Sequence, residues 1–589
     1  MKILGISLGH DSNFTLVEDG VIKSMVEVER FFRQKRYKLS AQTTKPGKIA
    51  NTYQYTDIAD LRLFLNKIKE DWGGSFDAVA VQNQGRKEEH ENLLEILKEE
   101  GISFKDSLHV DHHLSHASLA YFTSPFKDSL VLSFDGIGND GKTVFFRANG
   151  NEINYSANIE TAFGQSYNNL GYIIDIKPEI DGSTAGKVMG LASYGEIKNE
   201  WIPYAREYVL KYKKLKSAKV EGLSSYGKGH RVNDIGLRDI PELKKYTKKR
   251  KYPFEIRNFE EKIKFLLGIL KDTELELPGP EHKDSQDLIA TVQHVWTDEV
   301  LKLLKIHKKE NKNLCVVGGC ALNGTTNYEI EKSGLFEKNH FIPNPSDCGL
   351  SGGAALYTYY VTYKNNFSGA KEFFSPYLGS LPYDLDEIDS LSKKYPNKKV
   401  GDEELPKILA KLISQDLIVG LVRGNYEVGP RALGNRSILC NPLNKKMRDI
   451  LNDKVKHREW YRPFAPMVTE EDSGKYFTND NPVPYMSVIC DTRKEFREKL
   501  PSITHVDGTA RIQTVKKSQN PFIYQTLKEF EKITGMPVLL NTSFNPGGEP
   551  ILNFCKVALE MLDNTDMDLV IIENAIFSSH DKRHLLEAL

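Results

Sequence analysis

The strongest constraint on the fold is the pattern of strands and turns at the start of the chain. Residues 3–7 form an apolar, strand-like run that ends in the polar turn Gly9–Ser12. Two further strand-like runs, residues 14–17 and 21–28, are joined by the turn Glu18–Gly20. Turn residues at these spacings between short apolar runs predict a three-stranded meander.

Helical and strand-like segments alternate after this meander. Helical periodicity occurs over residues 60–71 and 88–100, and strand-like runs occur at residues 78–81 and 130–134. This alternation favours an α/β fold built from layers of sheet and helix. The same opening is typical of actin-like and sugar-kinase domains, in which the first turn faces phosphate, although many simple meanders also begin in this way.

A chain of 589 residues is too long for one ordinary hydrophobic core, so two or more domains are expected. Composition changes over residues 365–383, which are rich in Pro, Gly, Ser and Tyr. We therefore predict one domain over residues 1–372 and a second over residues 373–589. The 80 basic and 80 acidic residues balance, so the net charge of the whole chain indicates no class of partner.

The cysteines and the apolar runs indicate in which cellular compartment the protein resides. The six cysteines form no C-x-x-C pair, which favours buried free thiols in a reducing compartment. The first residues enter a strand-like run directly, without the apolar core of a signal peptide. No apolar run approaches the length of a membrane span. We expect a soluble, cytoplasmic protein with no membrane partner.

Two histidines at helical spacing form the first candidate site. His112 and His116 lie four residues apart in a helical segment, so their side chains share one face and can hold one metal ion. Asp135 and Asp347 each stand near glycine at a predicted strand end. Two imidazoles and two carboxylates suit iron, zinc or manganese. The alternative is a pair of ordinary surface or core histidines.

Glycine-rich turns form a second group of candidates. Residues 182–188 fail as a P-loop because the spacing is short by one and no Ser or Thr follows the lysine. The run Gly186–Gly195 instead suits close backbone packing around a ligand, with Lys187 placed to reach an anion. Asn323 follows a strand and a double glycine, which is typical of a turn that faces a nucleotide or phosphate.

Basic clusters follow the predicted domain boundary. Arg, Lys, Asn and Ser gather in residues 423–437, 456–466, 505–511 and 540–545, between apolar elements. Arginine forks and lysines in such turns are typical of polyanion binding, and we predict a triphosphate site there.

A strongly basic segment covers residues 211–251, within a predicted insertion at about 205–256. It contains fourteen Lys or Arg and only four Asp or Glu, with Tyr212, Tyr226 and Tyr246 interleaved. It is either a solvated surface insertion or an arm that binds nucleic acid and stacks its tyrosines on bases.

The motifs together resemble the O-carbamoyltransferase family of the nodulation-protein and tobramycin-carbamoyltransferase type, over nearly the whole chain. The motifs are Gly9–Asp11, Glu29–Phe31 with Arg33 and Lys35, the His112/His116 pair, Gly186–Gly195, Gly429–Ser437, Arg462–Pro466, Asp507–Arg511 and Asn541–Asn545. The resemblance implies an N-terminal actin-like (ASKHA) domain, similar to tRNA threonylcarbamoyl transferases, and a C-terminal YrdC-like α/β domain.

The resemblance also implies substrates and site residues. Such enzymes form carbamoyl-adenylate from carbamoyl phosphate and ATP with Mg²⁺, then pass the carbamoyl group to a hydroxyl. The implied ligands of Fe²⁺ or a similar divalent ion are His112, His116, Asp135 and Asp347. The implied nucleotide and carbamoyl-phosphate contacts are Arg431, Lys456, Arg462, Arg511, Asn541 and Ser543. We expect His10 to act as the base, with Asp11, Lys187 and Asn323 as further catalytic residues.

The acceptor and the functional class leave alternatives open. The chain has Arg36–Lys38 where the family has a histidine and then a proline-containing segment, which predicts an unusual acceptor. A small hydroxylated metabolite, sugar or antibiotic is the expected acceptor, and a hydroxymethylated base such as 5-hydroxymethylcytosine in DNA is the alternative. An actin-fold kinase and a nucleic-acid-binding scaffold are the other functional classes. A homodimer is possible.

Overall fold

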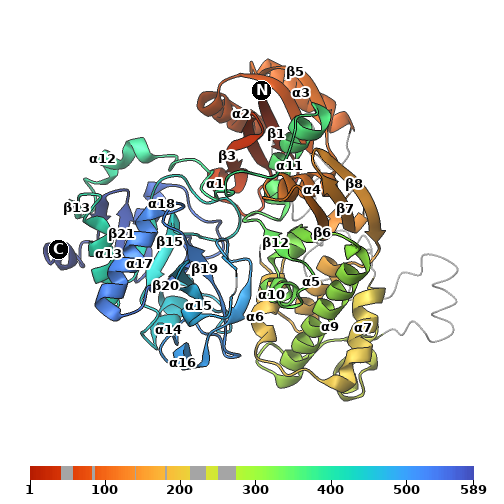
Figure 1. Cartoon of the computed structure of the whole chain (residues 1–589). Helices are drawn as coiled ribbons and strands as arrows, with labels where there is room; N and C mark the ends of the chain where they lie inside the picture. The colour runs from red at the N-terminus through yellow and green to blue at the C-terminus, as the bar shows by residue number, and fades with distance from the viewer. Residues whose placement is uncertain are drawn as a thin grey trace.

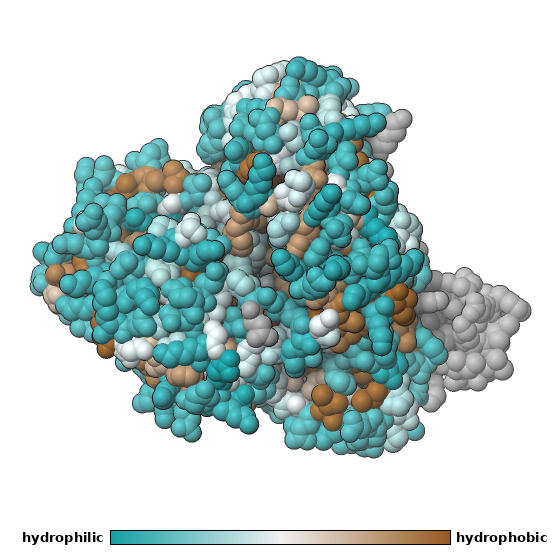
Figure 2. Space-filling model, in the orientation of Figure 1, coloured by the Kyte–Doolittle hydropathy of each residue, from teal (hydrophilic) through white to brown (hydrophobic). Residues whose placement is uncertain are grey.

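The computed structural model describes residues 1–41, 58–82, 87–138, 141–179, 182–212, 234–249, 273–479 and 481–589 (Figure 1). Two five-stranded sheets lie in the N-terminal half of the chain, and an eight-stranded sheet lies in the C-terminal half. Figure 2 shows a largely hydrophilic face with apolar patches scattered over both halves. No helix in the described ranges is long and apolar enough to cross a membrane.

The first sheet contains the predicted meander. Its strand order is β3-β2-β1-β4-β5, with β1 antiparallel to β2 and parallel to β4. The strands are β1 (Lys2–Ser7), β2 (Asn13–Glu18), β3 (Val21–Glu27), β4 (Ser75–Gln82) and β5 (Ser103–His109). The accompanying helices are α1 (Val28–Phe32), α2 (Ile58–Trp72) and α3 (Lys87–Glu99). The predicted strands and helices of this region are confirmed, with boundaries shifted by a few residues.

The second sheet repeats the order and strand directions of the first. Read as β8-β7-β6-β11-β12, it begins with two antiparallel pairs and ends with two parallel pairs. Its strands are β6 (Asp128–Gly138), β7 (Gly141–Asn149), β8 (Glu152–Ile159), β11 (Asn313–Val317) and β12 (Lys338–Phe341). The N-terminal half is therefore a duplicated mixed α/β arrangement, as expected for an actin-like domain.

Helices and short strands complete this half. The helices are α4 (His112–Phe122), α5 (Phe163–Ile173), α6 (Ala185–Ala192), α7 (Ile202–Lys211), α9 (Lys283–Lys308), α10 (Gly324–Lys332) and α11 (Leu350–Tyr357), and the strands β9 (Thr247–Lys249) and β10 (Thr273–Leu275) form a separate pair.

The C-terminal half is built on one mixed sheet, in the order β13-β22-β21-β14-β15-β20-β16-β19. Its strands are β13 (Asn397–Lys399), β14 (Val419–Val422), β15 (Arg436–Cys440), β16 (Ala465–Thr469), β19 (Gln513–Val515), β20 (Val538–Ser543), β21 (Leu569–Ile572) and β22 (Ala575–Phe577), and β17 (Ile489–Asp491) pairs with β18 (Thr509–Arg511). Its helices are α12 (Ile388–Leu391), α13 (Leu405–Ser414), α14 (Met447–Leu451), α15 (Ser473–Tyr476), α16 (Lys494–Arg497), α17 (Pro521–Thr534), α18 (Cys555–Asn564) and α19 (His584–Glu587).

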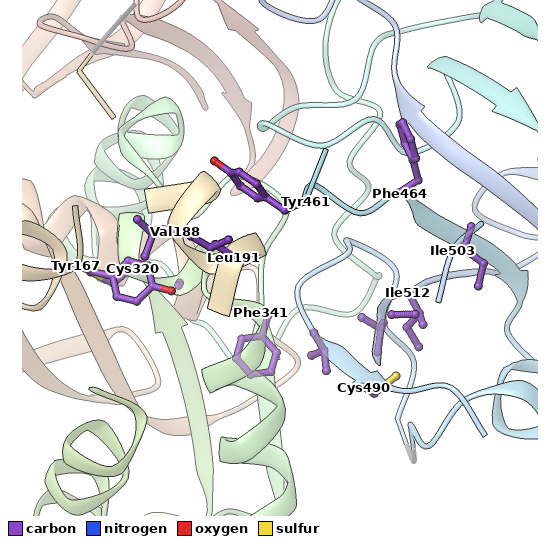
Figure 3. Close-up of a cluster of buried hydrophobic side chains, with 14 of the residues drawn as sticks. Tyr167, Val188, Leu191, Cys320, Phe341, Tyr461, Phe464, Cys490, Ile503 and Ile512 are labelled. Carbon is purple, nitrogen blue, oxygen red and sulfur yellow. The ribbon is translucent and has the colours of Figure 1, made fainter. Parts of the chain in front are cut away.

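One hydrophobic cluster runs across the two halves. Figure 3 shows part of it, with Tyr167, Val188 and Leu191 from the N-terminal half and Tyr461 and Ile512 from the C-terminal half. All of these side chains are buried. Because apolar burial stabilises in proportion to the area removed from water, the two halves stabilise each other along this boundary.

Close packing of two helices fixes the position of the histidine pair. Helix α4 carries His112 and His116, and its neighbour α11 is rich in glycine and alanine. A Cβ atom added at Gly353 would clash with the backbone oxygen of Ser115, one residue before His116. The absence of a side chain at Gly353 therefore sets how closely α11 approaches α4.

We expect Gly353→Ala to destabilise the protein, because backbone atoms of α4 cannot move aside as a flexible side chain could. Overpacking of this kind costs about 1–3 kcal/mol. Differential scanning calorimetry should show a lower unfolding temperature. Gly474→Ala in α15 is the matched control, because a Cβ there meets no atom within 4 Å. Equal stability of the two variants would contradict this account of the helix contact.

The basic segment is described only in part. Residues 213–233 and 250–251, with Tyr226, lie outside the described residues. Tyr212 is 7% exposed and belongs to the hydrophobic core, so the expectation that it stacks on bases is wrong. Lys245 pairs with Asp284 at 3.0 Å. The six cysteines are buried and free, as predicted.

Candidate functional site

The structure brings the four predicted metal ligands together. Nε2 of His112 and Nε2 of His116 lie 3.3 Å and 3.2 Å from Oδ2 of Asp135. The same two nitrogens lie 3.7 Å and 3.4 Å from Oδ1 of Asp347. Bonds of about 2.0–2.1 Å to a tetrahedral ion place neighbouring donors roughly 3.3 Å apart. The four donor atoms are therefore spaced as ligands of one first-row divalent ion would be.

The four ligands come from three elements. The histidines lie on the first turns of α4, Asp135 lies in β6, and Asp347 lies in the turn before α11. Oδ1 of Asp135 accepts hydrogen bonds from the backbone N–H of Gly136 at 2.7 Å and of Gly319 at 3.2 Å, which leaves Oδ2 for the histidines. Nδ1 of both histidines is buried without a hydrogen-bond partner among the described residues.

The carboxylates set the protonation of this cluster. Burial lowers the pKa of His116, but hydrogen bonds to Asp135 and Asp347 outweigh it and raise the pKa to about 9. Burial raises the pKa of Asp135, whereas His112 and His116 hold it well below its usual value. The buried carboxylates thus stabilise positive charge at the point where the four ligands converge. The residues present fit a divalent cation.

His10 adjoins this cluster. Its Nδ1 lies 2.8 Å from Oδ2 of Asp11, and its Nε2 lies 3.3 Å from Oδ2 of Asp347. Burial lowers the pKa of His10, but Asp347 and Asp11 outweigh that effect and raise it to about 9. Asp11 itself has a left-handed backbone, with φ of 60°. The predicted first turn therefore reaches the cluster, and Asp11 orients the imidazole toward Asp347.

Lys187 and Asn323 are held by protein partners. Nζ of Lys187 donates to the carbonyl oxygen of Lys177 at 2.9 Å and pairs with Glu459 of the C-terminal half. Asn323 caps helix α10, with Oδ1 accepting from the N–H of Thr326 at 3.1 Å. The polar atoms of Asn323 thus hold α10 in place, and its role toward a ligand stays a prediction.

A second centre consists of the buried Lys456 and of partly buried arginines, and we call it the buried-cation centre. Nζ of Lys456 donates to the carbonyl oxygen of Ser543 at 2.9 Å and to Oδ1 of Asn545 at 2.8 Å. Oγ of Ser543 donates to the same Oδ1 at 2.6 Å. The end of β20 therefore holds the lysine through neutral oxygens, and no carboxylate in the described ranges forms an ion pair with it.

The cations of this centre repel one another. Burial and the neighbouring Arg462 lower the pKa of Arg431 to about 10 and that of Arg458 to about 9. Burial and Arg458 hold the pKa of Lys456 well below its usual value. Burial and Arg431 do the same for Arg511. Nε of Arg431 is buried without a hydrogen-bond partner among the described residues. Bound anions would relieve this repulsion, so the centre suits a polyanionic ligand.

Sequence reasoning missed several members of the second centre. Lys35 pairs with Glu179 at 2.7 Å, and Glu179 lies 3.6 Å from Arg462. Glu459 lies 3.5 Å from Arg462 and also pairs with Lys187. Lys35 stood within a recognised motif, but no pattern around Glu179 distinguished it from other surface acids.

Asn541 and Arg511 form hydrogen bonds to residues outside the strands that carry them. Nδ2 of Asn541 donates to the carbonyl oxygen of Ala432 at 2.8 Å, so Asn541 supports the loop that carries Arg431. Nη1 of Arg511 donates to the carbonyl oxygen of Met486 at 2.9 Å, and its Nη2 lies 3.3 Å from Sδ of Met189 in α6. Arg511 therefore spans the boundary between the two halves.

Two family models match the chain. The model described as Carbamoyltransferase N-terminus matches residues 44–356, and the model described as Carbamoyltransferase C-terminus matches residues 410–579. An uncharacterized protein of Synechocystis is 31% identical over 98% of this chain and 96% of its own length. Nodulation protein NolO of Bradyrhizobium diazoefficiens is 30% identical over 79% of this chain and 78% of its own length.

Solved structures give weaker matches. A crystal structure of full-length HypF in a phosphate- and nucleotide-bound form has a TM-score of 0.30 and 13% identity, over 61% of this chain and 55% of that chain. A hexokinase of the ROK type from Thermus thermophilus has a TM-score of 0.28 and 12% identity, over 62% of this chain and 100% of that chain. These likenesses are too low to support an argument.

The sequence comparisons cover both halves of the chain. The N-terminal family match includes the histidine pair and both aspartates, and the C-terminal match includes the cluster of buried cations. The chain belongs to the carbamoyltransferase family.

Proposed function

We propose that this transferase is an ATP-dependent O-carbamoyltransferase with an activation centre and a transfer centre. The observation that carries the proposal is the group of cations around Lys456, Arg458 and Arg462, in which burial and repulsion by neighbouring cations lower the pKa values of Lys456 and Arg458. A triphosphate or an acyl phosphate supplies the negative charge that these side chains need. The C-terminal half would then be a YrdC-like domain that forms the adenylate.

The overall reaction has two steps. ATP, carbamoyl phosphate and water give carbamoyl-adenylate, pyrophosphate and phosphate. The acceptor hydroxyl then attacks the carbamoyl carbon and displaces AMP. Activation is required because the carbamoyl nitrogen donates electrons into the carbonyl and makes it a poor electrophile. In the first step, Arg431, Lys456, Arg462 and Arg511 would neutralise charge that develops on the phosphates.

The transfer centre would be the cluster of two histidines and two aspartates. His112, His116, Asp135 and Asp347 would hold Fe²⁺ or a similar divalent ion, which when bound supplies a Lewis acid for a carbamoyl or phosphate oxygen. His10, which is held by Asp11, would accept the proton of the acceptor hydroxyl once a bound cation offsets the charge of Asp347, which together with Asp11 raises the pKa of His10 to about 9. Mg²⁺ would enter with ATP.

The nucleotide products test the reaction class. We expect AMP and pyrophosphate from ATP when carbamoyl phosphate and an acceptor are present, as measured by chromatography of the nucleotides. An actin-fold kinase, the alternative class, would instead give ADP. ADP with a phosphorylated acceptor would remove the carbamoyl-transfer proposal.

The expected acceptor is a small hydroxylated metabolite, such as a sugar or an antibiotic. The alternative is a hydroxymethylated pyrimidine in DNA, because the positive charge of residues 211–251 would attract a phosphate backbone. In a duplex, such a base would be reached in the major groove or flipped out of the stack.

The acceptor test uses DNA that contains 5-hydroxymethylcytosine. The DNA is incubated with the enzyme, ATP and carbamoyl phosphate, then digested to nucleosides for mass spectrometry. With a small acceptor, we expect no carbamoylated nucleoside and no salt-sensitive DNA binding. A carbamoylated nucleoside that disappears when Lys244, Lys245, Lys248 and Lys249 are neutralised would establish the DNA alternative.

A further inference from the structure

Three charged residues away from both centres are buried at the boundary between the halves. Glu27 and Arg30 flank the start of α1 and are 2% and 1% exposed, and Glu427 of the C-terminal half is 0% exposed. Nε of Arg30 donates to Oε2 of Glu27 at 2.8 Å. Residues of this kind are rarely buried unless they are paired, so their arrangement requires an explanation.

Glu27 and Arg30 bind the backbone of one residue of the opposite half, Gly429. Nη2 of Arg30 donates to the carbonyl oxygen of Gly429 at 2.8 Å and to that of Glu427 at 3.1 Å. Oε1 of Glu27 accepts from the N–H of Gly429 at 2.9 Å. The hydroxyl of Tyr426 accepts from the N–H of Glu27 at 2.8 Å. Both polar backbone groups of Gly429 are therefore fixed by the N-terminal half.

Glu427 shapes the rest of the same loop. Its Oε1 accepts from the backbone N–H groups of four successive residues, at 2.5 Å from Leu433, 3.1 Å from Gly434, 3.2 Å from Asn435 and 3.2 Å from Arg436. The loop of residues 427–436 thus curls around one carboxylate oxygen. Arg431, which belongs to the buried-cation centre, lies at the middle of this loop.

The loop also touches the segment that leads to the metal cluster. Gly429 has a φ of 93°, and a Cβ atom there would clash with the carbonyl oxygen of Pro343. Asp347 follows four residues after Pro343 in the chain. The side chain of Asn13 in turn donates to the carbonyl oxygen of Asp347 at 2.8 Å. One loop therefore carries Arg431 and packs against the approach to a predicted metal ligand.

Two polar atoms of Glu27, Arg30 and Glu427 lack hydrogen-bond partners among the described residues. Nη1 of Arg30 and Oε2 of Glu427 are both buried without a hydrogen-bond partner among the described residues. A buried ion pair of this kind stabilises less than an apolar core of the same shape would. The directional hydrogen bonds of these charged side chains fix the position of the loop, which an apolar core of the same shape could not do.

We propose that Glu27, Arg30 and Glu427 are positioning residues. They fix Arg431 relative to the metal cluster, and so keep the buried-cation centre and the metal cluster at a fixed distance and orientation. The role of Arg431 in binding an anion rests on the proposed function, whereas the contacts of the three residues do not. The Glu29–Phe31 motif, which neither centre uses directly, gains a role through Arg30.

The test measures binding of inorganic triphosphate to the full-length protein by isothermal titration calorimetry. Arg30→Lys keeps the charge but loses the fork that holds Glu27 and both carbonyl oxygens. We expect triphosphate to bind about tenfold or more weakly, because small displacements of a binding group have large effects. Metal content should stay unchanged. Arg206→Lys in α7, which also loses a fork held by two carboxylates, is the matched control and should bind normally.

A double-mutant cycle separates positioning from general stability. In an Arg431→Ala background, Arg30→Lys should weaken triphosphate binding no further, since the group that it positions is absent. A purely structural role would give the same loss in both backgrounds and would overturn the proposal. Equal binding by wild type and Arg30→Lys would overturn it as well.

A milder variant covers the case in which Arg30→Lys does not fold. Tyr426→Phe removes only the hydroxyl that accepts from Glu27, and we expect triphosphate to bind about threefold more weakly. Unchanged binding would contradict the proposal. If the wild-type protein binds no triphosphate, both the proposed anion binding by the buried-cation centre and the positioning role are contradicted. If triphosphate binds but no carbamoyl transfer occurs, only the proposed function falls.

Discussion

Replacement of both His112 and His116 by alanine is expected to remove the metal ion and to stop carbamoyl transfer, while pyrophosphate release from ATP continues. The reason is that both nitrogens converge on Asp135 and Asp347, far in sequence from the buried cations of the C-terminal half. Loss of outer-shell partners of a metal typically costs about 10–100-fold in affinity or activity, so loss of two direct ligands should exceed about 100-fold.

Three measurements decide this prediction. Elemental analysis by inductively coupled plasma mass spectrometry gives the metal per chain, a pyrophosphate assay gives activation, and mass spectrometry of the acceptor gives transfer. His294→Ala is the matched control, because His294 is an exposed residue of helix α9. Full metal occupancy in the double variant would show that these residues are not the ligands. Loss of pyrophosphate release together with transfer would show that the centres do not work separately.

Arg511→Ala is expected to abolish pyrophosphate release from ATP. The partly buried guanidinium lies near Arg431, and desolvation and that neighbour hold the pKa of Arg511 well below its usual value, as expected for a cation that an anion would stabilise. Arginines that stabilise phosphoryl-transfer transition states contribute on the order of 10³-fold or more to the rate. Transfer should return when pre-formed carbamoyl-adenylate is supplied, because the metal cluster is untouched.

The control for Arg511→Ala is Arg493→Ala, which removes an exposed arginine from the same half. It should leave pyrophosphate release unchanged. Failure of carbamoyl-adenylate to restore transfer in Arg511→Ala would mean that Arg511 also serves the transfer centre. Its contact with Met189 of α6 gives a physical route for such an effect.

The shared core determines how these experiments should be designed. The residues that we propose for activation, Arg431, Lys456, Arg462 and Arg511, all lie beyond residue 372. The hydrophobic cluster across the boundary, however, includes Tyr461 and Ile512 together with Tyr167 and Leu191. Excision of residues 373–589 would expose this apolar surface, so inactivity of the excised piece would not test where activation occurs. Full-length variants avoid that problem.

Local patterns in the sequence were sufficient for the elements themselves. The opening meander, the strand at residues 313–317 and the helix that carries His112 and His116 agree with the structure because they depend on periodicity and turn residues close together in the chain. The spacing of the two histidines also placed them on one face, since a helix turn alone decides that relation.

The basic clusters that the sequence indicated in the C-terminal half lie close together in the structure. Arg431, Lys456, Arg462 and Arg511 lie in or beside one group of cations, because turns between buried strands meet at the same edge of the sheet. Pattern alone could not separate ligand-facing groups from supporting ones. Asn541, for example, supports a loop through a bond to Ala432, which is 109 positions away, and Asn323 caps helix α10 through the N–H of Thr326.

Only the tertiary structure decided which distant residues meet. Asp135 and Asp347 both lie within 4 Å of the two histidines although 212 positions separate these aspartates. Lys35 contacts the buried-cation centre by pairing with Glu179, which belonged to no recognised motif. Tyr212, expected at a nucleic-acid surface, instead packs into the core. The hydrogen bond from Arg30 to the carbonyl oxygen of Gly429 joins residues about 400 positions apart. Chain entropy opposes such contacts, and only the summed packing of whole sheets and helices holds them, so no local window of sequence contains them.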